Sequence, residues 1–145
     1  PKCPECPFMA TCEALHTNHM PELPVKNRTT KIKERHLSYV LISCQGYCAL
    51  HRRGPKDIWQ GLWEPCLFEN EPLPDWQGTL TLLNSHVKHV LTHRIIMADF
   101  YLLQTDVRPE LPPDYIWVKQ EDLNRYAVPR LVELLFESME KKTLL

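Results

Sequence analysis

Three cysteines near the start of the chain have a spacing that could hold a metal. Cys3, Cys6 and Cys12 follow a C-x2-C-x5-C pattern, in a segment too short to bury them in a core of its own. Thiolates select soft metals, so the pattern indicates zinc, copper(I) or an iron–sulfur cluster. A cubane cluster takes four cysteines, and this segment supplies three. His16, at C-x3-H after Cys12, would complete a four-ligand zinc set, and free or disulfide-bonded thiols are a third alternative.

Basic residues are grouped, although the net charge of the 145 residues is only −1. Grouped cations attract nucleic-acid phosphates without reading the base sequence. The two groups could form one positive face, and separate solvated surfaces are the alternative. They consist of Lys26, Arg28, Lys31, Lys33 and Arg35, and of His51, Arg52, Arg53 and Lys56.

Three histidines, His86, His89 and His93, would gather on one side of a helix and could bind zinc there. Their apolar and β-branched neighbours favour an extended strand instead. A strand divides these histidines between two faces, so we expect no zinc site here.

Strands account for most of the apolar segments. Residues 37–44 are apolar and β-branched, Gln45-Gly46 supplies a turn, and the chain returns over 47–53, which predicts a β-hairpin. Further strands are expected at 63–68, within 88–103 and at 115–118.

Two helices are predicted beside these strands. The first covers residues 74–84, because prolines and Asp75 resemble a helix start and Trp76, Leu80 and Leu83 share one face. The second begins near Pro129. Its apolar face consists of Val132, Leu135, Phe136 and Met139. Strands interleaved with two or three helices indicate an α+β fold.

Composition fits one small domain in a reducing compartment. The hydrophobic content of 43% is enough for a core. No apolar run reaches the roughly 18 residues that a membrane span needs. Cys44, Cys48 and Cys66 stand singly in apolar segments, where cysteine is usually a small buried hydrophobe.

Four segments, in order along the chain, resemble the adenine DNA glycosylases of the MutY type. The cysteine motif resembles the end of that family's iron–sulfur loop, C-x6-C-x2-C-x5-C. IWQGLWEPCLFE (58–69) resembles G-x-W-x-G-L-W-E-F-P, and HVLTH (89–93) falls where the family has H-x-F-S-H. YAVPRLVELL (126–135) is similar to the end of the family's C-terminal domain.

The resemblance implies an organisation in three parts. Residues 1–20 would be the end of an iron–sulfur loop whose first ligand lies upstream of Pro1, and 21–35 an interdomain linker. Residues 36–145 would be a Nudix-like lesion-recognition domain, a mixed β-sheet flanked by two or three helices. Cys3, Cys6 and Cys12 would hold a [4Fe–4S] cluster in the intact protein, and we expect this fragment alone to lack it.

The function implied is base excision repair. The family removes adenine mispaired with 8-oxoguanine in double-stranded DNA, and its catalytic helical domain would lie upstream of Pro1. We therefore expect no catalytic residue in this chain, which would read the oxidised base. A cytoplasmic, DNA-associated monomer without membrane contact is expected.

The segment HVLTH suggests how that base would be read. Guanine presents an acceptor at N7, and its 8-oxo form presents an N–H donor there, so the lesion is distinguished by a group that accepts. The Thr92 hydroxyl could accept, Leu91 could wedge beside the lesion, and His93 matches the family histidine. Lys31 and Arg52 are expected to contact phosphates. On the alternative interpretation, Leu91 is a core residue and Thr92 an ordinary strand residue.

A Nudix hydrolase would instead bind Mg²⁺ through several carboxylates of one helix, in the pattern G-x5-E-x7-R-E-x2-E-E-x-G. The segment that should correspond, residues 74–84, carries the single acid Asp75. We therefore expect no pyrophosphohydrolase activity. The alternative function is a non-catalytic protein-interaction module on a degenerate Nudix fold with a zinc-binding tail.

Overall fold

The computed structural model describes residues 1–25 and 32–143, in two compact units, Pro1–Lys31 and Ile32–Leu145. The first unit is a chain of short helical turns, because its prolines and polar residues allow no longer element. These turns are η1 (Cys3–Glu5), η2 (Met9–Thr11), α1 (Glu13–His16) and η3 (Met20–Glu22).

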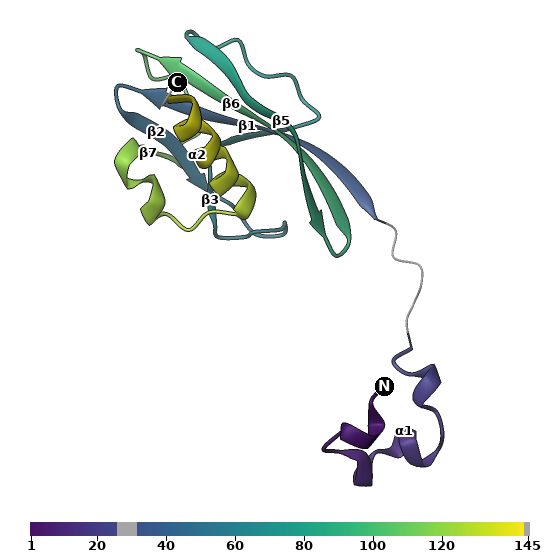
Figure 1. The fold of residues 1–145 in the computed structure, drawn as a ribbon. Coiled ribbons are helices and arrows are strands. Elements are labelled where there is room, and N and C mark those ends of the chain that lie inside the picture. Colours follow the sequence, from purple (N-terminus) through teal and green to yellow (C-terminus); the bar gives the residue numbers. More distant parts are fainter. Residues whose placement is uncertain (26–31, 144–145) are drawn as a thin grey trace. The chain divides into compact units, whose positions relative to one another are not determined.

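The second unit is a seven-stranded mixed sheet with the helix α2 (Arg130–Thr143) across one face (Figure 1). Its path runs β3-β2-β1-β6-β5, while β4 pairs with β1 and β7 pairs with β2. Only β1 and β6 are paired in parallel. The strands are β1 (Lys33–Cys44), β2 (Tyr47–Arg52), β3 (Trp63–Glu64), β4 (Cys66–Glu69), β5 (Thr79–Leu91), β6 (Arg94–Thr105) and β7 (Tyr115–Lys119), and a 3-10 helix, η4 (Gln120–Arg125), precedes α2.

Most elements agree with the sequence prediction. β1 and β2 form the expected hairpin, with Gln45 and Gly46 both at positive φ in a two-residue turn that suits the twist of the strands. The strand expected within 88–103 is β6, that at 115–118 is β7, and the last helix starts next to Pro129. The four apolar residues predicted for its face are all buried. The α+β class and the mixed sheet are confirmed.

The helix predicted at 74–84 is wrong. Residues 70–78 form a loop, and Thr79 begins β5, which pairs with β6. Gly78 has φ +135°, outside the helical region, and a Cβ there would lie 2.4 Å from the backbone oxygen of Gln104. The pairing with β6 therefore outweighs the helical spacing of Leu80 and Leu83.

The strand expected at 63–68 is interrupted. Pro65 separates β3 from β4, and the two short strands pair with different neighbours, β2 and β1. Proline lacks the N–H that a continuous ladder requires, so the chain changes partners at this point.

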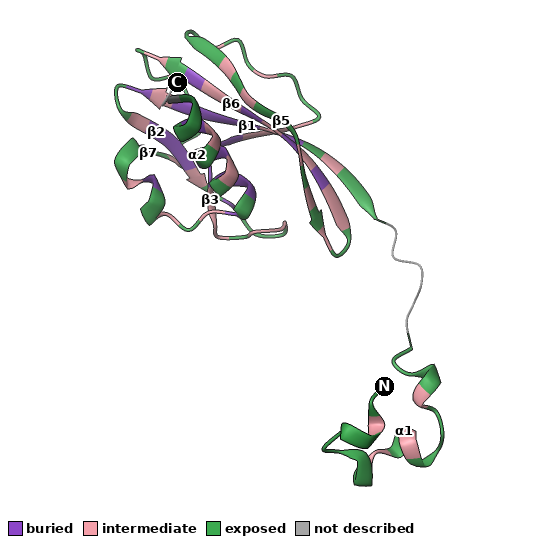
Figure 2. Ribbon diagram, viewed as in Figure 1, coloured by how far each residue is buried: buried purple, intermediate pink, exposed green. Residues whose placement is uncertain are grey.

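The core lies on both faces of the central strands (Figure 2). Tyr39, Phe100 and Leu135 of α2 belong to one buried cluster, and Val40 and Leu103 belong to a second, which is covered by side chains of loops and strands such as Trp76 and Trp117. Cys44, Cys48 and Cys66 are buried as predicted. Burial raises the pKa of Cys48 and of Cys66 to about 11, so neither thiol ionises at neutral pH.

Candidate functional site

The hairpin between β5 and β6 ends in an exposed two-residue turn. Leu91 pairs with Arg94, which leaves Thr92 and His93 at the tip, both exposed. Among residues 1–25 and 32–143, the Thr92 hydroxyl has no hydrogen-bond partner. The backbone oxygen of His93 accepts from the Lys33 amide at 3.2 Å, which ties the tip to β1.

Leu91 has a different setting from its two neighbours. It is half-buried and packs against the core cluster beneath α2. Leu91 thus makes the core contact that the alternative interpretation expects, and it is also partly exposed beside Thr92. The structure brings Leu91, Thr92 and His93 together at one end of the sheet.

The loop over residues 53–62 packs beside this hairpin. Its ends are joined by hydrogen bonds from the Arg53 amide to the Leu62 oxygen (2.8 Å) and from the Gly61 amide to the Arg53 oxygen (3.0 Å). Trp59, at φ +61°, places its ring 5.9 Å from that of His89 in β5. The Arg53 guanidinium lies 5.8 Å from the Trp59 ring, within cation–π range. Non-glycine residues at positive φ are costly, which indicates that these contacts hold the loop in place.

Asp57 lies at the centre of a network of ion pairs. Arg35 donates to its two carboxylate oxygens at 3.0 and 3.1 Å, Arg53 at 2.7 Å and Arg94 at 3.0 Å. The backbone amide of Ile58 donates a fifth hydrogen bond at 2.7 Å. One carboxylate therefore joins β1, the loop and the first residue of β6.

Two further carboxylates complete the charge balance. Glu69 accepts two hydrogen bonds from Arg35 at 2.6 and 2.7 Å, and Glu64 accepts one from Arg53 at 2.6 Å. Arg53 and Glu64 have side chains only 7% and 3% exposed, so their pairing is required to offset the loss of water. Three arginines thus face three carboxylates.

The network also sets the protonation of its members. Burial alone would raise the pKa of Asp57, but hydrogen bonds from Arg35, the Ile58 amide and Arg94 outweigh it and hold that pKa well below its ordinary value. The hydrogen bond from Arg35 likewise lowers the pKa of Glu69. Both carboxylates are therefore ionised at any pH at which the domain would work.

A cavity of about 290 Å³ opens next to these charges. Its lining includes Glu64 and His51, whose ring stacks on Tyr115 with 4.6 Å between centroids. His51 places its two nitrogens 3.3 Å from Glu64 and 3.5 Å from Asp114. The cavity presents a histidine between two carboxylates. Within the described ranges, however, no three His, Cys, Asp or Glu side chains are placed to hold one metal ion.

The basic groups of the sequence are divided by this arrangement. Arg35 and Arg53 form ion pairs with carboxylates. The prediction of one positive face that includes these two arginines is therefore wrong. Arg52 is exposed, and its Nε donates to the Gly61 oxygen at 2.8 Å. Lys31 lies outside the described residues, as do Lys26 and Arg28.

Asp57 and Arg94 are site residues that the sequence did not reveal. Arg94 directly follows HVLTH, which was a usable signal. Asp57 stands among basic residues of a loop and gave none, because its partners Arg35 and Arg94 lie 22 and 37 positions away in sequence.

The three amino-terminal cysteines line one cavity of about 580 Å³, together with apolar neighbours such as Leu23. Cys3 donates from Sγ to the Met20 sulfur at 3.1 Å. His16 is not part of this lining, and its Nε2 lies 3.0 Å from the Ala10 oxygen. A cubane is held at several of its own iron atoms, so its ligands surround a volume rather than converge on a point. Within residues 1–25, the three thiols are not placed to hold one metal ion, with or without His16.

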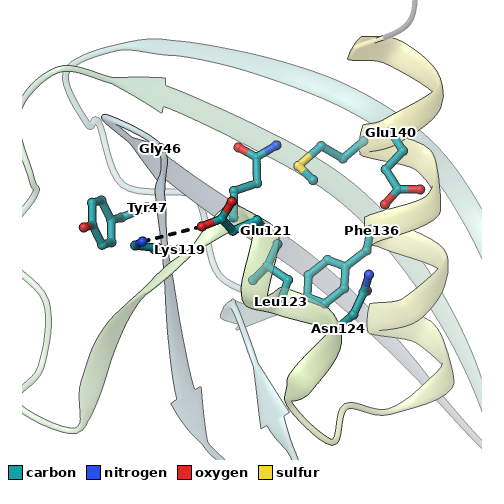
Figure 3. A pocket seen from close by; sticks show the side chains of 10 residues that line it. Gly46, Tyr47, Lys119, Glu121, Leu123, Asn124, Phe136 and Glu140 are labelled. Atoms are coloured by element: carbon teal, nitrogen blue, oxygen red, sulfur yellow. Dashed lines mark hydrogen bonds and ion pairs between the residues drawn. The ribbon is translucent and has the colours of Figure 1, made fainter.

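A groove of about 590 Å³ lies between η4 and α2 (Figure 3). Its floor holds Leu123 and Phe136, and its rim carries Glu140 and the pair of Lys119 with Glu121 at 3.5 Å. The floor residues are buried, and the lining has neither a nucleophile beside a base nor a cluster of metal ligands. We assign no chemistry to it.

Comparison with known proteins identifies the fold. A family model described as NUDIX domain matches residues 38–138. A search of curated proteins by sequence gives no match. Within the described part of the chain, no helix is long and apolar enough to cross a membrane.

Several solved structures share this fold. The C-terminal domain of mouse MUTYH, crystallised with human PCNA, superposes with a TM-score of 0.62 at 20% identity, covering 77% of this chain and 90% of that one. The MutT protein of Methanosarcina mazei Go1 has a TM-score of 0.58 at 19% identity, over 77% and 96%. The Escherichia coli ORF135 protein has 0.54 at 17%, over 76% and 91%. At these identities the similarity establishes the fold alone.

Proposed function

The chain belongs to the NUDIX domain family, and from this premise we propose that its second unit reads damaged DNA rather than hydrolysing a nucleotide. We propose the 8-oxoguanine-recognition domain of a MutY-type adenine DNA glycosylase, an enzyme that removes adenine mispaired with 8-oxoguanine. The observation that carries the proposal is the exposed tip of HVLTH, where the Thr92 hydroxyl is free of partners among the described residues.

The chemistry of the tip suits the lesion. Thr92 accepts a hydrogen bond from N7–H of 8-oxoguanine, a contact that guanine cannot supply because its N7 is itself an acceptor. Leu91, half-exposed beside it, wedges against the stacked bases, and His93 donates to a base edge or a phosphate. Arg52 and Lys31 contact phosphates, which adds affinity without sequence preference.

The carboxylates argue against the hydrolytic alternative. A Nudix hydrolase holds Mg²⁺ through acids of one helix, whereas residues 70–78, between β4 and β5, form a loop. The acids that flank this region, Glu64 and Glu69, are each bound by an arginine. Turnover of oxidised dGTP with Mg²⁺ by the purified chain, lost on substituting Glu64, would favour a MutT-like hydrolase instead.

The cysteine tail supports the same parent protein. Cys3, Cys6 and Cys12 would hold three corners of a [4Fe–4S] cluster, with the fourth thiolate supplied from upstream. When bound, the cluster would fix the fold of this loop. The alternative of a zinc-binding interaction module needs His16 as a ligand, and His16 does not line the cavity that the three cysteines share.

Partners follow from this assignment. Double-stranded DNA containing the mispair and an upstream catalytic helical domain are the expected ones, in a reducing compartment. The mouse MUTYH domain was solved with PCNA, so a protein partner of that kind is a further candidate.

DNA binding by the purified chain tests the proposal. Fluorescence anisotropy with short duplexes, at one fixed salt concentration, should give tighter binding to 8-oxoguanine:adenine than to guanine:adenine. Affinity for both should fall as salt rises, because phosphate contacts release counterions. Equal affinity for the two duplexes would refute lesion reading by this domain, whatever its affinity for DNA.

A further inference from the structure

We infer that Asp57 is a positioning residue for the tip of the β5–β6 hairpin, acting through Arg94. The inference rests on the proposed function, since it assigns to Asp57 the task of holding Leu91, Thr92 and His93 in place for a base. Asp57 touches none of these three residues directly among the contacts of the structure.

Asp57 is connected to the tip of the hairpin through Arg94. Asp57 Oδ1 accepts from Arg94 Nη1 at 3.0 Å. Arg94 is the residue directly after His93, and it pairs across the hairpin with Leu91. One side-chain contact therefore fixes the residue that closes the turn.

Asp57 is itself held in place by donors other than Arg94. Oδ1 also accepts from the Ile58 amide at 2.7 Å and from Arg35 at 3.0 Å, while Oδ2 accepts from Arg35 at 3.1 Å and Arg53 at 2.7 Å. Arg53 is buried, and Arg35 belongs to the central strand β1. The carboxylate is thus held by the rigid part of the sheet and transmits that rigidity to Arg94.

The side chain at position 57 has to be a carboxylate. Each oxygen accepts at least two hydrogen bonds from cationic or backbone donors, which the amide of asparagine cannot do on both sides. Its loss would also leave three arginines beside two carboxylates, so the arginines would repel one another and Arg94 would turn to solvent. The ring contact of Trp59 with His89 provides a second link from the same loop to β5.

The test compares Asp57→Asn with Glu69→Gln in the 145-residue chain. Both remove one negative charge from Arg35, but only Asp57 reaches Arg94. Hydrogen exchange should show the amides of residues 91–94 exchanging at least about tenfold faster in Asp57→Asn, the loss expected for a charged hydrogen bond. In Glu69→Gln these amides should keep the wild-type rate, and in both variants the amides of β2 and β7 should exchange faster only by the factor that matches the variant's loss of global stability. Asp57→Glu, which keeps the charge, should restore part of the protection.

The DNA readout then separates this inference from the function on which it rests. Asp57→Asn should lower the ratio of affinities for 8-oxoguanine:adenine and guanine:adenine duplexes at fixed salt, while Glu69→Gln keeps it. Equal protection of residues 91–94 in wild type and Asp57→Asn would overturn the positioning role, even if the wild-type chain prefers the lesion. Exchange at the tip could be faster in Asp57→Asn while the wild-type chain shows no preference for the lesion. That result would support the positioning role of Asp57 through Arg94 and would refute lesion reading. An equal increase in exchange at residues 91–94 and throughout the sheet in Asp57→Asn would also overturn the inference, because Asp57 would then stabilise the whole fold without positioning the tip.

Discussion

Asp57 and Thr92 are two different kinds of proposed site residue. Asp57 accepts several hydrogen bonds, whereas the Thr92 hydroxyl has no partner among the described residues. Five donors surround the Asp57 carboxylate, whereas the Thr92 hydroxyl is exposed and unbonded there. The sequence indicated Thr92 because HVLTH is a contiguous motif, and its role in binding a base stays a prediction. Asp57 could not be predicted, since the strand pairing that brings its arginines together is set by the whole sheet.

Acid should weaken the fold through Asp57. The pKa of Asp57 is held below its ordinary value in the folded protein, so its contribution is present at neutral pH and is lost as the pH falls below about 4, the region where an unfolded aspartate takes up a proton. Unfolding in urea, measured from pH 7 downwards, should therefore show a falling midpoint in the wild type.

Asp57→Asn should be less stable than wild type by about 1–3 kcal/mol at pH 7, with the smaller value favoured by its partial exposure. Its midpoint should fall less steeply with acid. Asp75→Asn is the control, because Asp75 is exposed and makes no ion pair with the described residues. If the urea midpoint of the wild type decreases with falling pH no more steeply than that of Asp57→Asn, the lowered pKa of Asp57 in the folded protein would be contradicted.

At the scale of elements, sequence patterns gave the correct type wherever local and long-range preferences agreed. The β1–β2 hairpin had its turn residues beside its strands, and α2 had an unbroken apolar face. The segment 74–84 had helical spacing but strand neighbours, and the neighbours determined its structure. Close backbone contact at Gly78 could not be inferred, because its partner Gln104 is distant in sequence.

Gly78→Ala should be destabilising. A Cβ would lie 2.4 Å from the Gln104 oxygen, and φ +135° suits few residues with a side chain. We expect a loss of at least about 1–3 kcal/mol in the free energy of unfolding, measured in urea. Gly54→Ala is the matched control: it has open space around it and no positive φ, so its stability should stay close to that of wild type. Equal stability of the two variants would mean that β5 does not approach β6 so closely.

At the scale of the molecule, the chain consists of a cysteine-bearing unit and a NUDIX domain. The Nudix fold of the domain could be predicted because three of its segments, in order, resembled one family. The common cavity of the three cysteines could not, since spacing alone does not show whether thiols face one volume.

Metal analysis of the intact protein, including the proposed upstream segment, should find iron and sulfide. Cys6→Ser should lose the iron, because the substitution removes one of the thiolates around the cavity. His16→Ala should keep it, since His16 lies outside the cavity lining. One zinc per chain, lost in His16→Ala, would contradict the cluster and support the zinc-binding alternative.

The proposal that the hairpin tip reads the lesion is tested most directly by Thr92. The measurement is the ratio of affinities for 8-oxoguanine:adenine and guanine:adenine duplexes at one salt concentration, for wild type, Thr92→Ala and Thr92→Ser. Thr92→Ala should lower the ratio roughly tenfold, the equivalent of losing a hydrogen bond of about 1–3 kcal/mol. Thr92→Ser keeps the hydroxyl and should retain the wild-type ratio. An unchanged ratio in Thr92→Ala would contradict the account, because the hydroxyl at the tip would then play no part in recognising the oxidised base.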